Sequence, residues 1–370
     1  FDSGCMPFAQ WGYPHQGHAE FERSFPADFI SEAIDQTRGW FYSLLMVSTL
    51  LQDEVEIPHP YKTCIVLGHI CDKKGRKESK SKGNYTPPDA ILESDGADAM
   101  RWYFYSANPP WNNTQYSPEA VRQSQQDFLV KVQNVYAFFV IYANIDAFDP
   151  RVHIPRPAAD RSLLDRWMLS ELQLTLREVT EAMDDYRLYD ASQRLITFID
   201  AVSNWFVRRS RDRFWASSEG DDAADKWDAY NTLYEVLTTL SRMAAPFVPF
   251  ITDKIYRNLV LNADPDAPDS VHLTDWPSLE EAQIDENLSE EMQAVRELVS
   301  VGLQIRASHR LKVRQPLPQA ELVLGKPSLT ARVKPYAELI AEELNVKEVV
   351  FTQEAADRVT FQVKPNYRAL

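Results

Sequence analysis

The sequence has few cysteines and no long apolar segment, and both shortages narrow the class of protein. Cysteine occurs three times in 370 residues, at positions 5, 64 and 71, and no two form a CxxC pair. A disulfide framework or a structural zinc site is therefore not expected, and we predict no metal ligands. No apolar run approaches the roughly 18 residues of a membrane span, and the first residues lack the regions of a signal peptide. We predict a soluble, cytoplasmic, monomeric protein without a membrane partner.

Basic charge is also in short supply, which at first argues against a nucleic-acid partner. The formal net charge is −15, whereas binding to a phosphate backbone needs cations. The distribution points the other way, because residues 72–82 carry a net charge of +4, residues 208–213 of +3 and residues 306–314 of +4, which leaves −26 on the remainder. An acidic body with three basic stretches admits polyanions only at chosen places, although each stretch alone is also compatible with an ordinary solvated face.

Neither of the usual glycine-rich phosphate loops, GxxxxGKS/T or GxGxxG, occurs in the sequence. The candidate that takes their place is KESKSKGN, residues 77–84. Its lysines supply point charges and its serines supply hydroxyl donors, which together suit a triphosphate, and Gly83 allows a tight end to the loop. From composition alone, the same stretch is also compatible with a disordered surface turn.

Changes in apolar period divide the first 160 residues into helices and one strand. An amphipathic helix is predicted to begin after Pro26 and to cover residues 26–51, and the run YKTCIVLG, residues 61–68, predicts a buried strand that leads into the basic loop. Further helices are predicted after Pro88, after a turn at Gly96 and over residues 118–145, before a proline-rich, charged linker at residues 146–161.

Beyond the linker, apolar residues recur every three or four positions, which predicts a helix bundle. Three such faces run from Leu164 to Met183, from Leu195 to Phe206 and from Leu233 to Met243, and a last long helix is predicted over residues 287–307. The tail alternates between short apolar runs and a helical stretch, at residues 320–324, 333–344, 347–351 and 358–363. That alternation is typical of a small α+β domain.

Two motifs in the first 90 residues resemble a known family. Lys77-Glu78-Ser79-Lys80-Ser81 is similar to the KMSKS signature of class I aminoacyl-tRNA synthetases, and EAIDQTRGWF, residues 32–41, resembles the DQxRGWF element of the isoleucyl members. Valyl and leucyl relatives share the basic loop but not the DQTRGWF run, so the resemblance favours isoleucine. Further similar stretches extend it over nearly the whole chain: residues 1–11, 96–111, 203–215, 270–277 and 311–317.

The resemblance implies a fold class and a division into domains. The expected architecture is α/β at first, the C-terminal half of a Rossmann-type catalytic domain, then an all-α helix bundle that binds the anticodon, then a small α+β domain. The catalytic half would occupy residues 1–105 and a helical connecting region residues 106–160. The bundle would occupy residues 161–310 and the last domain residues 311–370.

The resemblance also implies roles for individual residues. Lys80, the second lysine of the signature, would stabilise the transition state in which the carboxylate of isoleucine attacks the α-phosphate of ATP, with Lys77 and Ser79 holding the nucleotide. The implied partners are isoleucine, ATP with Mg²⁺ and tRNA(Ile). The other implied contacts are Gly68, His69 and Ser81 to ATP, Glu32, Asp35 and Gln36 to the aminoacyl-adenylate, and Trp205, Arg208, Arg209 and Arg211 to tRNA. Trp205 also fits a buried helix face.

The chain departs from the family pattern at three points. Glu78 stands where the signature has methionine, Ala33 stands where family members usually have glycine, and the family's HIGH motif is missing. The letters His15-Gln16-Gly17-His18 are similar to HIGH, but they follow QWGYP rather than a strand. We therefore expect HIGH and the editing insertion to lie upstream of Phe1. A non-catalytic tRNA-binding relative and a valyl-type class I synthetase remain as alternatives.

Overall fold

A computed structural model of the chain describes residues 1–53, 59–220, 223–324 and 327–352. It divides into two compact units, residues 1–282 and residues 283–370, and each is described here by itself. Most of the described chain is helical, with three separate two-stranded parallel sheets. Among these residues no single helix is both long and apolar enough to cross a membrane. One pair bent by 43°, α6 (Pro118–Asp127) and α7 (Leu129–Ile145), passes the same test of length and composition.

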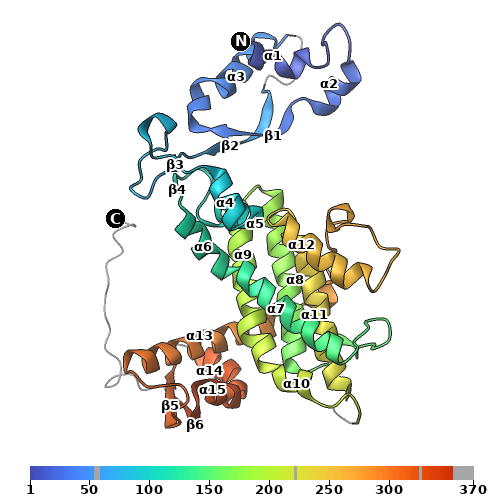
Figure 1. Ribbon diagram of the computed structural model, residues 1–370, viewed down its shortest axis with the longest axis vertical. Helices are drawn as coiled ribbons and strands as arrows, with labels where there is room; N and C mark the ends of the chain where they lie inside the picture. The colour runs from blue at the N-terminus through green and yellow to red at the C-terminus, as the bar shows by residue number, and fades with distance from the viewer. Residues whose placement is uncertain (54–58, 221–222, 325–326, 353–370) are drawn as a thin grey trace. The chain divides into compact units, whose positions relative to one another are not determined.

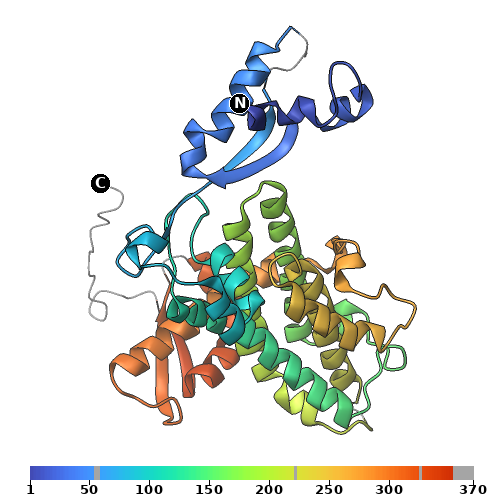
Figure 2. The ribbon, with the colours of Figure 1, turned by 45° about the horizontal axis from the view of Figure 1, so that its top comes forward.

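The first unit begins with two helices, α1 (Asp2–Ala9) and α2 (His18–Ser24), followed by a β-α-β arrangement. Strand β1 (Ala27–Ala33) pairs in parallel with β2 (Tyr61–Leu67), and α3 (Trp40–Leu50) makes the crossover (Figures 1 and 2). Helix α3 covers one face of the sheet, where Phe41 and Leu44 pack on Ile30. Because the two strands are parallel, their carboxyl ends lie at the same edge of the sheet.

The prediction of one helix over residues 26–51 is wrong in its first half. Residues 27–33 form strand β1, residues 34–38 a 3₁₀ turn, and only residues from Trp40 onward an α-helix. The strand is specified by partners distant in sequence, since its backbone pairs with β2 from Ala27 opposite Tyr61 to Ala33 opposite Leu67. Those partners are not visible in a local apolar period.

The predicted strand at residues 61–68 is confirmed as β2, which leads through Gly68 into β3 (Ile70–Cys71) and the basic loop. After the loop come α4 (Pro88–Ser94) and α5 (Ala97–Ser106), as predicted, and β4 (Thr114–Gln115), which pairs in parallel with β3. The predicted helix over residues 118–145 divides at Phe128 into α6 (Pro118–Asp127) and α7 (Leu129–Ile145). Phe128 is 1% exposed, and its ring stacks on that of Trp102 with 4.0 Å between the ring centres. This packing fixes the break between α6 and α7.

The predicted bundle is present and fills the rest of the first unit (Figure 1). Its long helices pack their apolar faces together, and the ends of α9 and α12 widen into π turns. The elements are α8 (Leu163–Asp184), α9 (Leu188–Ala201) with η4 (Val202–Val207), α10 (Arg211–Trp215), α11 (Ala223–Ala244) and α12 (Pro249–Tyr256) with η5 (Arg257–Leu261). The linker is tied to it by the ion pair of Arg156 with the buried Asp228.

The second unit starts earlier than the domain that we predicted from residue 311. It contains α13 (Glu286–Ser308), which the sequence analysis assigned to the bundle, and a β-α-β arrangement. Strands β5 (Leu317–Val323) and β6 (Val346–Thr352) are parallel, and α14 (Pro327–Val333) and α15 (Ala337–Leu344) lie between them in sequence. The strand predicted at residues 358–363 lies outside the described residues.

Candidate active site

Side-chain hydrogen bonds connect the basic loop with the residues that precede it. The carboxylate of Asp72 accepts hydrogen bonds from the backbone N–H of Lys74, from Arg76 and from the side-chain amide of Asn84. These bonds, above all the one from the Arg76 guanidinium, hold the pKa of Asp72 well below its usual range. Asn84 in turn accepts from the backbone N–H of Ser79 at 3.0 Å. Asp72 and Asn84 therefore fix the two sides of the loop.

The tip of the loop presents its cations to solvent. Lys80, Ser81 and Lys82 form a short 3₁₀ turn, η2, which ends at Gly83 with φ of 66°, a backbone conformation that favours glycine. Lys80 and Lys82 are exposed, and the Lys80 ammonium lies 5.2 Å from the ring centre of Tyr85. The hydroxyls of Ser79 and Ser81 are 2.9 Å apart. This arrangement displays two ammonium groups and two hydroxyls on one turn.

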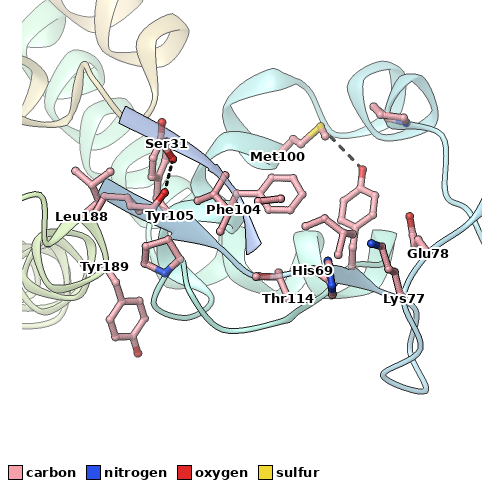
Figure 3. Close-up of a pocket in the computed structure, with 18 of the residues that line it drawn as sticks. Ser31, His69, Lys77, Glu78, Met100, Phe104, Tyr105, Thr114, Leu188 and Tyr189 are labelled. Atoms are coloured by element: carbon pink, nitrogen blue, oxygen red, sulfur yellow. Dashed lines mark hydrogen bonds between the residues drawn. The ribbon is translucent and has the colours of Figure 1, made fainter. Parts of the chain in front are cut away.

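A cavity of about 950 Å³ opens beside the loop, on the face of the β1–β2 sheet opposite α3. Its walls are largely apolar, and its volume is within the range of small-molecule sites. Figure 3 shows Lys77 and Glu78 at one end of it, Phe104 near the middle, and Leu188 and Tyr189 at the other end. The charged side chains of Lys77 and Glu78 thus lie at the end next to the basic loop.

Four of the predicted site residues line this cavity, namely Asp35, Gly68, His69 and Lys77. Gly68 is required sterically, because a Cβ there would lie 2.1 Å from the carbonyl oxygen of Asn112. The backbone N–H groups of Gly68 and His69 already donate to Pro110 and to the Asn113 side chain, at 2.8 Å each. Any contact of these two residues with a nucleotide would therefore use the His69 ring or a carbonyl oxygen.

The other predicted adenylate contacts lie elsewhere. In β1 the residues that line the cavity are Phe29, Ser31 and Ala33, so the alternation of the strand directs Glu32 to the opposite face. Gln36 caps α3, since its side-chain oxygen accepts from the backbone N–H of Trp40 at 2.8 Å. The structure thus gives Gln36 a local structural role and brings only Asp35 of this group to the cavity.

Glu78 is the residue of the site that the sequence marks as unusual. Its backbone N–H donates to the carbonyl oxygen of Ile70 at 2.9 Å, and its side chain lines the cavity. One carboxylate oxygen, Oε1, is buried and has no hydrogen-bond partner among the described residues. Burial, together with the charge of Glu78, raises the pKa of the neighbouring Tyr116. Glu78 therefore places an uncompensated acceptor at the end of the cavity next to the basic loop.

We expect Glu78→Met to raise the free energy of unfolding by about 1 to 2 kcal/mol, because a buried acceptor without a donor costs that much to desolvate. Urea unfolding of the chain measures the change. The matched control is Glu93→Met, at an exposed glutamate of α4, which should leave stability within about 0.5 kcal/mol. Equal stabilities for the Glu78 variant and the parent chain would show that water reaches the carboxylate.

The predicted tRNA contacts divide into exposed and buried groups. Arg208 and Arg211 are exposed, Arg209 is half-buried, and Trp205 is only 7% exposed. The wide π turn η4 brings Val202, Trp205 and Phe206 inward together, so the Trp205 ring packs in the core and presents no stacking face. Trp215, at the end of α10, is 58% exposed, and sequence reasoning missed it because only its neighbours in space reveal which tryptophan is buried.

Of the HIGH-like letters, residues 15–17 lie in the turn between α1 and α2 and His18 begins α2, and no strand of the described chain precedes them. Gly17 has φ of 65° there, and a Cβ would lie 2.2 Å from the carbonyl oxygen of Trp11, so the turn itself requires this glycine. Among the described residues, no group of three or more histidine, cysteine, aspartate or glutamate side chains is arranged to hold a metal ion.

Comparisons with known families agree with this arrangement. Residues 1–115 match the family described as tRNA synthetases class I (I, L, M and V), and residues 165–322 match the anticodon-binding domain of tRNA ligase. The chain is therefore similar to class I tRNA synthetases in these two segments. Within that class it is similar to isoleucine–tRNA ligases, with 45% identity over all 370 residues to the ligase of Clostridium novyi and 47% over 354 residues to that of Dehalococcoides mccartyi.

The resemblance stated from the two motifs is thus confirmed, and the chain spans about a third of the length of these ligases, 34% in each case. Solved structures support the fold. A LeuRS of Agrobacterium radiobacter, in a ternary complex with tRNA and LeuAMS, is 20% identical with a TM-score of 0.59. That match covers 77% of this chain and 33% of the LeuRS chain. Mycobacterium tuberculosis methionyl-tRNA synthetase in complex with methionyl-adenylate is 19% identical with a TM-score of 0.56. That match covers 72% of this chain and 54% of the methionyl-tRNA synthetase chain.

Proposed function

We propose that this chain is the part of a cytoplasmic isoleucine–tRNA ligase that contains the KMSKS-like loop and the anticodon-binding bundle. The observation that carries the proposal is the position of the loop of residues 77–84, whose Lys77 lines the same cavity as Gly68 and His69 at the carboxyl end of β2. The identity to isoleucine–tRNA ligases along the whole chain supports isoleucine rather than valine as the amino acid.

In the proposed reaction, a carboxylate oxygen of isoleucine forms a bond to the α-phosphorus of ATP and pyrophosphate leaves. Lys80, exposed on η2, would stabilise the negative charge that develops on the phosphate oxygens, and Lys77 lines the cavity from the same loop. The Asp72 carboxylate is engaged with Arg76 and Asn84. In the part of the chain that the structure describes, no group of three or more histidine, cysteine, aspartate or glutamate side chains could hold a metal ion, so Mg²⁺ would be held mainly by the nucleotide phosphates.

The proposal is tested by isoleucine-dependent exchange of labelled pyrophosphate into ATP. We expect exchange from a polypeptide of the length of the ligase relatives that contains these 370 residues. We expect none from the 370 residues alone, because their sequence contains no HIGH motif. Exchange that depends on valine and not on isoleucine would favour a valyl-type enzyme.

A second candidate function is suggested by Glu78, whose charge beside the phosphate-binding lysines opposes nucleotide binding. In that case the chain belongs to a tRNA-binding relative that has lost adenylation. Absence of exchange from the long polypeptide, together with retained tRNA binding, would decide for this alternative. In both cases the bundle is proposed to bind tRNA, with the exposed Arg208 and Arg211 on phosphates and Trp215 as a stacking surface.

A further inference from the structure

We infer that the turn of residues 309–314, at the end of α13 in the second unit, is a second RNA-binding surface that contacts the phosphate backbone. The turn reverses the chain between α13 and β5. Arg310, with φ of 57°, sits at the reversal, and the backbone N–H of Leu311 donates to Arg306 at 2.8 Å. The proposed tRNA contacts of the bundle do not include this turn, so the inference extends the proposed function and rests on it.

Arg306 holds the turn in shape from inside. It is only 4% exposed, and its Nη2 donates to the carbonyl oxygens of Lys312 at 3.2 Å, of Val313 at 3.1 Å and of Gln315. The Asn345 side chain donates to the same Val313 oxygen at 2.8 Å. No carboxylate of the described residues forms an ion pair with Arg306, and its Nε and Nη1 are buried without an acceptor. A buried cation therefore shapes the turn, and its positive charge is not neutralised there.

The outer side of the turn is cationic and unpaired. His309, Arg310, Lys312 and Arg314 are all exposed, and none of them forms an ion pair within the described part of the chain. Arg332, in the same unit, shows the contrast, because it pairs with both Glu290 and Glu291. In a chain with a net charge of −15, clustered cations that form no ion pair within the described residues are a feature that suits a polyanion.

An RNA backbone fits this turn better than a lipid surface. Membrane binding of this kind needs an amphipathic helix or a larger basic cluster on a protein that is not otherwise strongly acidic. The turn also lies within residues 165–322, which match the anticodon-binding domain of tRNA ligase. Ile305 and Val313, 55% and 49% exposed, add apolar surface next to the cations, where sugar faces can pack.

The test measures the affinity of the chain for a tRNA(Ile) transcript at several salt concentrations. Lys312→Gln with Arg314→Gln should reduce the slope of log affinity against log salt by about one to two units, because each phosphate contact contributes roughly 0.7 to 0.9. The matched control, Lys334→Gln with Lys347→Gln, removes the same charge from exposed sites of the same unit and should leave the slope unchanged. Arg306→Lys keeps the charge but not the three-carbonyl fork, and should reduce the slope as well.

The binding measurements distinguish an error in this inference from an error in the proposed function. If Arg208→Gln with Arg211→Gln lowers the slope and the turn variants do not, tRNA binds through the bundle alone and the inference is wrong. If the parent chain does not bind the transcript at all, both are wrong. Loss of binding to phosphatidylserine vesicles in the turn variants, with tRNA binding unchanged, would assign the turn to a membrane and overturn the inference.

Discussion

Lys80→Ala, in a polypeptide active in pyrophosphate exchange, is expected to lower the rate of isoleucyl-adenylate formation by about a hundredfold or more. Removal of one well-placed donor to a developing oxyanion costs about 2.7 to 4 kcal/mol in the transition state. The Lys80 ammonium is exposed on η2 near Tyr85, and no carboxylate of the described residues pairs with it. Its charge is therefore available to the triphosphate.

The affinity for isoleucine should change little in the same variant, because a charge used mainly in the transition state affects turnover rather than ground-state binding. Single-turnover measurements separate the two quantities. Lys82→Ala is the matched control, since Lys82 is exposed on the same 3₁₀ turn, and its effect should be much smaller. A Lys80 variant that forms adenylate at the parent rate would show that the loop resembles the signature without performing its role.

Local apolar periods predicted the long helices well, because each helix of the bundle buries one continuous face. The predictions failed where the deciding contact is distant in sequence. Strand β1 is fixed by its pairing with β2, and the break at Phe128 is fixed by stacking on Trp102. Neither partner lies within one helical turn of the residue that it controls, so a period of three or four cannot reveal it.

In the candidate site too, features fixed by residues close in sequence could be predicted, and features fixed by distant residues could not. The hydrogen bonds of the basic loop depend on Asp72 and Asn84, which lie within 12 residues of each other and flank the signature. By contrast, the backbone N–H groups of Gly68 and His69 donate to acceptors within residues 110–113, some 40 positions away. No sequence motif predicts these hydrogen bonds. The motif thus identified the loop from the sequence. The residues that line the cavity, and which of their backbone N–H groups are already hydrogen-bonded, could be learned only from the structure.

Arg213 is expected to be the most important charged side chain for the stability of the bundle. Its Nη1 donates to Asp165 at 3.1 Å and its Nε to Asp225 at 2.7 Å. Asp165 is completely buried, and apart from Arg213 its carboxylate accepts from the Ser162 hydroxyl at 2.7 Å. The ion pair links the starts of α8 and α11 to α10, so it joins three helices of the bundle.

Arg213→Leu should lower the free energy of unfolding by about 3 to 5 kcal/mol, because it leaves the Asp165 charge buried without a cation. Urea unfolding of the chain measures the loss. Arg211→Leu, at an exposed arginine two residues earlier, should change stability by less than about 0.5 kcal/mol. The double variant Arg213→Leu with Asp165→Leu should recover much of the lost stability, since replacing both partners by apolar groups removes the unpaired charge. A single variant that loses less than about 1 kcal/mol would mean that water enters beside Asp165 and solvates its carboxylate.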